Sequence, residues 1–539
     1  MLLWMIGGAA FAAPVSTSLS QPLQVAAGLP SDLRETWAQV YPLADAASLV
    51  VTLEIDPPRF DFAALPNDVD VELQAGDLVQ VRAPYEALGA LGQQAGVRRA
   101  RLPWVASPKV ESEGIDQLFP DGRWSENRHL GRRQRIAIFD VGFVGDEALL
   151  GEELPREVER LGSGMVEASE HGVAVAEIIY DIAPKAELVF VPFRTEVEFI
   201  NAVSLVGAER DPFDIAVGAI GFDNVWATDG TSPVSEAVAD LVDSGVVWIA
   251  AAGNEAKRYR TGALTDIDGD LILEIDGQEG AWIDASGGVF DVSFRWSEPM
   301  GEARIDIQLG AYVGQGDDLS DRELCATSTE SQNGAGDPLE RLALDCGTFD
   351  IRIAPFVEDP DLVDQLGELT GYLYSPDGYV DSTVSAPSSL TLPADAPGAI
   401  AVGGCDLAMG IPDYTSQGPT EDGRTKPDLC APYIASTASY GDRGFEGTSA
   451  SVPHVAGMVA VLREAERIDD VAETRDRLLA AALDIGDEGV DNETGHGLAQ
   501  LDEPPCGCAS AQGGAAALLP ALWMLLVRRR RFAPGDRLQ

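Results

Sequence analysis

Basic residues and histidine are scarce in this sequence of 539 residues. It contains 37 Lys and Arg against 88 Asp and Glu, which gives a formal net charge of −51, and only 4 His. A surface with this charge repels phosphate backbones, so we expect no nucleic-acid partner. Any mechanism that needs an imidazole must use one of the four histidines, which are His129, His171, His454 and His496.

Cysteine is also rare, with 6 in the whole chain. Two of them stand near the C-terminus. The other four, Cys325, Cys346, Cys405 and Cys430, form an even set, which in an exported chain predicts two disulfides. Sequence order favours Cys325 with Cys346 and Cys405 with Cys430, although other pairings, or free buried thiols, remain open.

The N-terminus lacks the basic residues that usually open a signal peptide. Its apolar run nevertheless ends in Ala10-Phe11-Ala12, which fits the small-x-small rule of a signal-peptidase site. Residues 1–13 therefore predict a signal peptide and an exported protein. A misassigned start or a partial signal is the alternative.

The C-terminal segment, residues 503–539, lacks an apolar run of the roughly 20 residues that a spanning helix needs. Cys506-Gly507-Cys508 precedes a shorter apolar run, residues 513–527, and then the basic cluster 528–531. This layout resembles the myxobacterial-type C-terminal sorting tags, in which a Cys ahead of the apolar helix becomes the anchoring point. It predicts attachment to the membrane or cell surface, with a retained tail anchor as the alternative.

Residues 14–117 predict a small α/β domain. Strand-like segments lie at 48–55, 78–83 and 96–102, and a helical segment lies at 85–94. A small domain ahead of an enzyme is typical of a propeptide that guides folding and blocks the active site. A permanent accessory domain is the alternative.

Residues 118–257 and 389–502 predict one α/β domain that a long insertion divides. Apolar strands are expected at 136–139, 187–192, 215–220, 246–250 and 399–403, with helices at 173–180 and 234–243. Continuous apolar strands between helices indicate a doubly wound, mostly parallel sheet that is buried on both faces. Residues 258–388 instead show alternating strands, which predict an inserted β-sandwich.

Two polar residues stand at the ends of expected elements in the first half. Asp140 ends a strand, where a parallel sheet gathers its chemistry, although a lone Asp there is usually a turn former or helix cap. His171 and Gly172 directly precede the helix expected at 173–180, and Gly172 is expected to leave room for a substrate backbone. His454 lies about 140° around its helix from Ser449, so we expect a structural role for it.

The segment Gly447–Gly457 places Ser449 at the start of a helix, where positive potential favours developing negative charge. A lone serine there would be an ordinary N-cap. Pro453 is expected within the first turn, where a missing N–H costs little. Asn254 follows an apolar strand and offers an amide suited to an oxyanion hole, together with the Ser449 N–H, although an isolated Gly-Asn is usually a turn.

Together, the segments around Asp140, His171, Asn254 and Ser449 resemble the subtilisin-like serine peptidases, in that family's order. Further similarity lies at 183–186, 416–419, 426–428 and 431–432. The resemblance covers roughly residues 130–257 and 389–500. It implies that His171 takes the Ser449 proton, that Asp140 orients the imidazole, and that Asn254 binds the oxyanion.

Three positions depart from that family's usual pattern: Val141, Val173 and Ala219 stand where Thr or Ser is common. None of them removes a reacting atom. Ala219 lies in the segment 216–221, which the resemblance implies is the edge that pairs with substrate. The details of the substrate pocket therefore stay open.

The insertion resembles a β-sandwich of some bacterial subtilases through residues 328–332 and 337–340. That resemblance implies a role in substrate positioning or surface attachment, with a plain spacer as the alternative. Asp266, Asp268 and Asp270 offer hard oxygen ligands for calcium, but a solvated acidic turn is the simpler interpretation. The expected chemistry requires no cofactor.

The sequence thus predicts an exported or surface-anchored serine endopeptidase, a monomer that acts on protein or peptide substrates. The alternative is a catalytically weak surface binding protein on a subtilase scaffold. Its working part would be the inserted sandwich.

Overall fold

The computed structural model describes residues 19–31, 34, 43–103, 115–119, 129–162, 168–283, 289–314, 319–346, 351–376, 380 and 387–501. The expected signal peptide and the expected sorting tail, residues 503–539, lie outside these ranges. Within them, no helix is both long enough and apolar enough to cross a bilayer.

A seven-stranded parallel sheet forms the centre of the region that the sequence divides in two. Its strands, in spatial order, are β21 (Leu429–Ala431), β20 (Ile400–Gly404), β9 (Val247–Ala251), β8 (Ile215–Gly218), β5 (Arg135–Asp140), β7 (Glu187–Pro192) and β6 (Glu159–Arg160). All neighbours run parallel. The expectation of a mostly parallel sheet is confirmed, and we call this part the parallel-sheet region.

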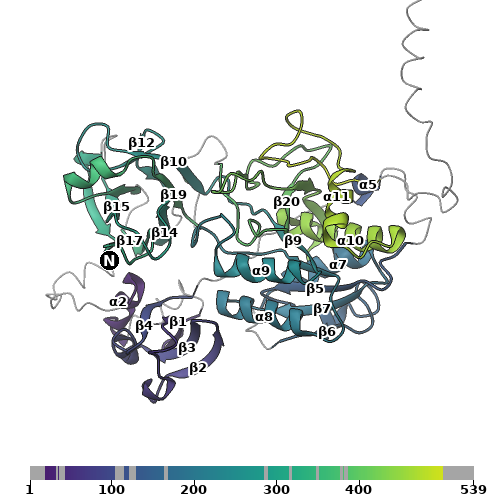
Figure 1. Ribbon diagram of the computed structural model, residues 1–539, viewed down its shortest axis with the longest axis horizontal. Coiled ribbons are helices and arrows are strands. Elements are labelled where there is room, and N and C mark those ends of the chain that lie inside the picture. Colours follow the sequence, from purple (N-terminus) through teal and green to yellow (C-terminus); the bar gives the residue numbers. More distant parts are fainter. Residues whose placement is uncertain are drawn as a thin grey trace, which may run out of the picture. The chain divides into compact units, whose positions relative to one another are not determined.

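Helices cover both faces of this sheet (Figure 1). One face carries α7 (His171–Ile182) and α10 (Thr448–Glu466), and the other carries α8 (Glu196–Ala208) and α9 (Pro233–Asp243). Alternate residues of β5 enter opposite cores, Ile138 on the α7 side and Phe139 on the α8 side. This burial on both faces explains why the strands are continuous apolar runs. Two shorter helices, α5 (Ile115–Leu118) and α11 (Val471–Leu479), belong to the same region.

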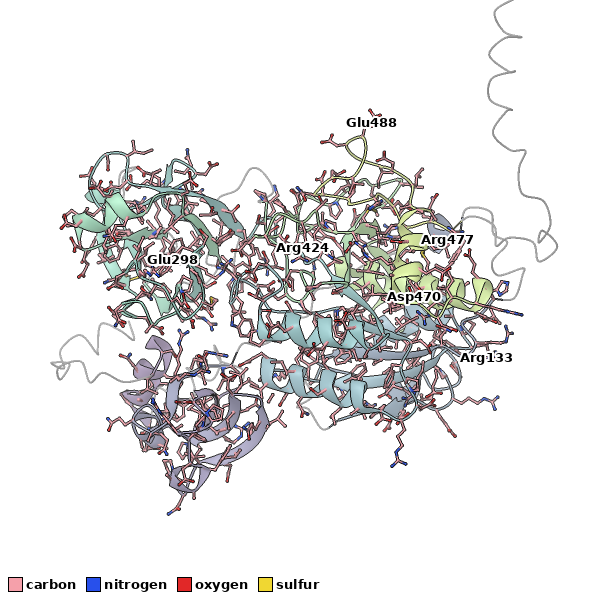
Figure 2. All side chains as sticks on the ribbon, viewed as in Figure 1. Arg133, Glu298, Arg424, Asp470, Arg477 and Glu488 are labelled. Atoms are coloured by element: carbon pink, nitrogen blue, oxygen red, sulfur yellow. A yellow bond between two sulfur atoms is a disulfide. The ribbon has the colours of Figure 1, made fainter. Side chains whose placement is uncertain are left out.

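Some charged residues of this region are exposed, whereas others, such as Asp140 and Glu196, are buried. Arg133, Asp470 and Glu488 are exposed (Figure 2). Arg477 pairs with Glu466 at 3.0 Å. The hydrophobic cores on the two faces of the sheet are built from apolar side chains.

The inserted region, residues 258–388, contains two antiparallel sheets. One has the order β12 (Gln278–Glu279), β11 (Glu274–Ile275), β10 (Tyr259–Thr265), β19 (Thr370–Tyr374), β14 (Val289–Trp296), β17 (Leu339–Asp345). The other has the order β13 (Ala281–Trp282), β18 (Ile351–Phe356), β15 (Gln308–Val313), β16 (Glu323–Thr327). Both sheets contribute to one apolar core, which includes Phe294 and Leu373 from the first and Leu309 and Ile353 from the second.

Buried polar groups join the inserted region to the parallel-sheet region. Both guanidinium nitrogens Nη1 and Nη2 of Arg295 donate to the carboxylate of Glu421. The hydroxyl of Tyr374 lies 3.0 Å from an oxygen of Asp223 and 3.0 Å from an oxygen of Glu255. Arg295 is 2% exposed and Glu255 is fully buried, so these charges have little access to water.

The N-terminal region, residues 19–103, contains a four-stranded antiparallel sheet with the order β2 (Asp70–Ala75), β3 (Leu78–Pro84), β1 (Ser48–Ile55), β4 (Val97–Arg101). Helix α2 (Gln21–Ala27) precedes it. The helix expected at 85–94 is shorter: a 3₁₀ turn, Tyr85–Ala87, leads into α4 (Leu88–Leu91). Gly89 and Gly92 disfavour a longer helix.

Two disulfides join the pairs that sequence order favours. Cys325 is bonded to Cys346 in the inserted region, with Cα atoms 6.1 Å apart. Cys405 is bonded to Cys430 in the parallel-sheet region, with Cα atoms 5.6 Å apart. The predicted pairing is therefore confirmed.

Candidate active site

Asp140 and His171 meet at one end of the parallel sheet. Asp140 is the last residue of β5, and His171 is the first residue of α7. Nδ1 of His171 lies 2.6 Å from Oδ2 of Asp140, and both side chains are fully buried. An imidazole that donates its Nδ1 proton to a carboxylate keeps Nε2 as a proton acceptor. The pair therefore has the geometry of a general base held in one tautomer.

Gly172 permits the contact between Asp140 and His171, and its role differs from the one predicted from the sequence. Its backbone N–H donates to the carbonyl of Gly142 at 2.9 Å. A Cβ at this position would lie 2.5 Å from the Phe143 ring and 2.8 Å from Cβ of Asp140. The space that we expected for a substrate backbone is therefore filled by the turn after β5, which packs directly against α7.

Ser449 is the second residue of α10, and its side chain is fully buried. The helix is preceded by Gly447, whose φ of 101° suits glycine. The hydroxyl of Ser449 donates to the backbone carbonyl of Ala219 at 2.8 Å. This partner could not be predicted from the sequence, because Ala219 contributes only its backbone.

Pro453 lies deeper in α10 than expected. Because the helix begins at Thr448, Pro453 falls in the second turn and not in the first. Its missing N–H would otherwise have paired with the carbonyl of Ser449, four residues earlier. The prediction was wrong by one turn, and the consequence is a carbonyl at Ser449 that lacks the usual helical partner.

Asn254 follows β9 and contacts the residue before Ser449. Its Oδ1 accepts hydrogen bonds from the backbone N–H of Thr448 at 3.0 Å and from the Thr448 hydroxyl at 3.1 Å. With two donors on the oxygen, the Nδ2 end is the part of the amide that can serve a further acceptor. A Cβ at Gly447 would lie 2.7 Å from that Nδ2, so the close approach requires glycine.

The side chain of His454, on α10, is buried. Its Nδ1 donates to the carbonyl of Ala450 at 2.7 Å. Burial lowers the pKa of His454 to about 4, against the smaller opposing effect of its backbone partners. A buried neutral imidazole with this bond fits the structural role that we expected.

A hairpin that the sequence did not suggest covers His171. It consists of β22 (Ile434–Thr437) and β23 (Gly441–Glu446) and leads directly into α10. The Phe445 ring lies 5.3 Å from the imidazole of His171, and Tyr440 packs on Phe445 at 5.1 Å. Glu177 of α7 accepts hydrogen bonds from the backbone N–H of Ala438 and from the hydroxyl of Ser439, both at 2.5 Å. The sequence feature that could have indicated this contact is Glu177, the single charged residue in the expected helix at 173–180.

The segment 216–221, expected to pair with substrate, divides into two parts. Strand β8 ends at Gly218 and is bonded on both sides, to β5 and to β9. Residues 216–218 therefore have no free backbone edge. Only the part that follows the strand, 219–221, is left for that role.

The side chains of Asp266, Asp268 and Asp270 place carboxylate oxygens within 4.8 Å of one another. Backbone N–H groups of the same loop already donate to them, with Gly269 bonded to Asp266 at 2.9 Å and Ile272 bonded to Asp270 at 2.8 Å. These contacts are those of an acidic turn. A calcium site here remains a prediction.

Comparison with known proteins gives a match to the Subtilase family model over residues 377–497. The matched segment contains Ser449 but neither Asp140, His171 nor Asn254. Over 121 residues the chain is 33% identical to Bacillopeptidase F of Bacillus subtilis (strain 168). That alignment spans 21% of this chain and 8% of the length of Bacillopeptidase F.

Among solved structures, the CspB protease of Clostridium perfringens is similar in fold. The TM-score is 0.52 at 15% sequence identity, and the alignment covers 71% of this chain and 94% of the other. At this identity the likeness shows the fold alone. The family match and the relative support a subtilisin-like, serine-type peptidase.

Proposed function

We propose that the protein is a serine endopeptidase that hydrolyses peptide bonds through Asp140, His171 and Ser449. The observation that carries this proposal is the 2.6 Å contact between His171 and Asp140, at the same sheet end as the start of α10. The family match over the segment with Ser449 supports it independently. Proteins and peptides are the proposed substrates, and no cofactor enters the chemistry.

In the proposed reaction, the Ser449 hydroxyl first exchanges the Ala219 carbonyl for Nε2 of His171. Its oxygen then attacks the substrate carbonyl while the proton passes to Nε2, and Asp140 stabilises the imidazolium. The oxyanion is bound by Nδ2 of Asn254 and the Ser449 N–H. His171 then returns the proton to the leaving amine, which leaves the acyl-enzyme. In the second half of the reaction, His171 takes a proton from water as the water oxygen attacks the acyl group, and it returns this proton to the departing oxygen of Ser449.

The alternative, a catalytically weak binding protein on the same scaffold, is not favoured. Each position that the mechanism needs carries a reactive side chain, and the polar contacts of Asp140 and Asn254 are those that catalysis requires. A scaffold kept only for binding would not need them.

We further propose that the protein is exported and that the N-terminal region keeps it latent. The two disulfides are consistent with an oxidising compartment. Asp140, His171 and Ser449 have no exposed surface in the intact chain, where Phe445 of the β22–β23 hairpin covers His171. Latency through the N-terminal region stays a prediction from the place of this region ahead of the peptidase. Attachment of the C-terminal tail to a membrane or cell surface stays a prediction.

Labelling with a fluorophosphonate probe tests the proposed nucleophile. We expect the wild-type chain to be labelled and to hydrolyse casein once the N-terminal region is removed, and we expect Ser449→Ala to lose both properties. Ser451→Ala is the matched control, because Ser451 lies in the same helix and donates to the carbonyl of Ala431 at 3.0 Å. Labelling that survives Ser449→Ala, or a wild-type protein that is never labelled, would contradict the proposal.

A further inference from the structure

The N-terminal region contacts the inserted region through Ala343 of β17, which packs against the apolar core of the N-terminal region, and through Arg99. Arg99 of β4 donates from Nη1 to Asp337 at 2.5 Å and from Nη2 to Glu330 at 2.6 Å. The side chains of the three residues are 17%, 20% and 22% exposed, in the order Arg99, Asp337, Glu330. A guanidinium held by two mostly buried carboxylates is a strong, directional contact.

The same strand contacts the parallel-sheet region through a second arginine. Arg101 donates from Nη1 to Glu196 of α8 at 2.9 Å, and it is 2% exposed while Glu196 is fully buried. Thr52 donates to the same carboxylate at 2.8 Å. Residues 99 and 101 lie on one face of β4 because side chains alternate along a strand. One strand face therefore binds two parts of the chain that are far apart in sequence.

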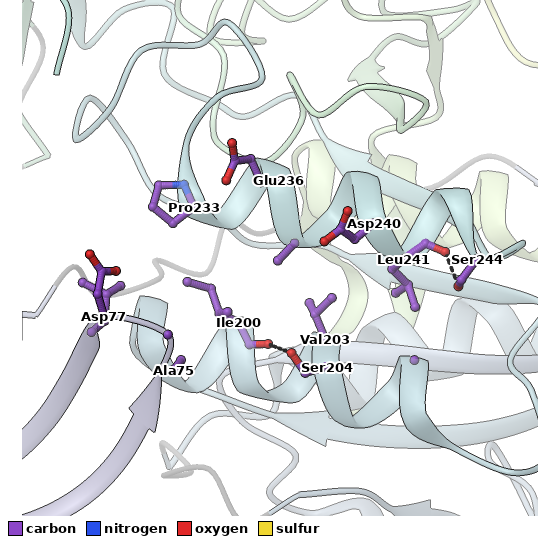
Figure 3. A pocket seen from close by; sticks show the side chains of 14 residues that line it. Ala75, Asp77, Ile200, Val203, Ser204, Pro233, Glu236, Asp240, Leu241 and Ser244 are labelled. Carbon is purple, nitrogen blue, oxygen red and sulfur yellow. Dashed lines mark hydrogen bonds between the residues drawn. The ribbon is translucent and has the colours of Figure 1, made fainter. Parts of the chain in front are cut away.

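The rest of the boundary is loosely packed. A cavity of about 430 Å³ separates the turn at Asp77 from helices α8 and α9, where it is lined by Ile200, Val203 and Glu236 (Figure 3). A second cavity, of about 250 Å³, is lined by residues of all three regions, among them Arg98, Trp226 and Met300. Because these spaces interrupt the packing at the boundary, polar contacts such as those of Arg99 and Arg101 contribute a larger share of the attachment.

We infer that the inserted region carries a docking surface for the N-terminal region, with Glu330 and Asp337 as the receptor for Arg99. This surface keeps the N-terminal region bound after the chain between the N-terminal region and the rest of the protein is cut. This retention rests on the proposed function, because we attribute the cut to the peptidase activity. Two contacts made by one rigid strand reinforce each other, so loss of either one strongly weakens the binding of the whole strand. The carboxylates of Glu330 and Asp337 are engaged by Arg99 and are not open to an incoming substrate in this form.

Amide hydrogen exchange on the full chain tests the docking. Ser449→Ala is included throughout so that the chain stays uncut. We expect Arg99→Ala to raise exchange in β4 by at least about tenfold. Arg98→Ala is the matched control and should leave β4 unchanged, because Arg98 pairs with Asp77 inside the N-terminal region and is 57% exposed.

A reciprocal variant removes the concern that Arg99→Ala unfolds its own region. Glu330→Gln combined with Asp337→Asn changes only the inserted region, more than 200 residues away in sequence. It should raise exchange in β4 as Arg99→Ala does. Unchanged exchange in β4 for this variant, or an equal effect of Arg98→Ala, would overturn the docking surface.

Gel filtration of chains with Ser449 intact tests retention. After cleavage, the N-terminal fragment of the wild type should elute with the remainder, and the fragment of Arg99→Ala should elute alone with faster fluorophosphonate labelling of the remainder. Immediate loss of the wild-type fragment would overturn retention. A wild-type chain that is never cut would overturn the proposed function, while the exchange experiment would still decide the docking surface.

Discussion

The parallel-sheet region and the inserted region each have an apolar core, and the contact between them includes buried charges as well as apolar side chains such as Leu339. Inside each region, continuous or alternating apolar strands bury one another. Between the regions lie the ion pair of Arg295 with Glu421 and the Tyr374 hydroxyl beside two carboxylates. An apolar core tolerates many substitutions of similar volume, whereas removal of one partner of a buried ion pair is strongly destabilising. The junction, rather than either core, is therefore the more sensitive place for single substitutions of charge.

Substitution of Asp140 should give the largest effect, and on activity rather than on folding. Asp140→Asn should lower kcat/KM by about 10⁴-fold, as in other Ser-His-Asp enzymes, because an amide no longer holds the His171 tautomer or stabilises its charge. Hydrolysis of a peptide substrate measures this. The control is Asp146→Asn, whose carboxylate pairs instead with Arg160 at 2.7 Å. Near-normal activity of Asp140→Asn would contradict the proposed role of Asp140.

Breaking the junction should affect stability next most strongly. Glu421→Ala leaves the buried guanidinium of Arg295 without its carboxylate and should lower the free energy of unfolding by about 3–5 kcal/mol. Asp422→Ala removes the exposed pair with Arg424 and should cost less than about 1 kcal/mol. Urea unfolding of both variants measures the difference. Equal losses would show that the junction is no more sensitive than the surface.

The smallest expected effect depends on pH and concerns the core of α10. His454 has a folded-state pKa of about 4, below its unfolded value of about 6.5, so the unfolded chain binds the extra proton first. Stability from this residue is present above about pH 6.5 and falls as the pH drops towards 4, by up to about 3 kcal/mol. His454→Asn should remove this part of the acid destabilisation, as measured by urea unfolding at pH 7 and pH 4.5. His496→Asn, at a half-buried position, should leave it in place, and an unchanged pH profile for His454→Asn would refute the assignment.

The features that could be predicted from the sequence are those that depend on short segments of the chain. Each strand expected in the parallel sheet is present, and Asp140, His171 and Ser449 stand at the ends of elements whose local patterns mark them. Asn254 was predicted for the same reason, since it lies shortly after an apolar strand.

What the sequence did not predict depends on contacts between distant segments. Arg99 and Glu330 are 231 residues apart, and nothing distinguishes either from the other charged residues of the chain. The turn that fills the space beside Gly172, and the Ala219 carbonyl that binds Ser449, are backbone atoms that every residue carries. Pro453 was misplaced because a helix start could not be fixed to within one turn.

The insertion also has a consequence for the order of folding. Asn254 and Thr448 are bonded across 194 residues, a long loop whose closure costs entropy. Strands β10 and β19 nevertheless pair so that Tyr259 lies opposite Tyr374, which brings the start and the end of the insertion together. An insertion that folds first shortens the loop that the rest of the chain must close, and the late-synthesised Ser449 then reaches its site by a shorter search. The rate at which the inserted region folds would then limit the rate at which Ser449, the proposed nucleophile, reaches His171, its proposed base.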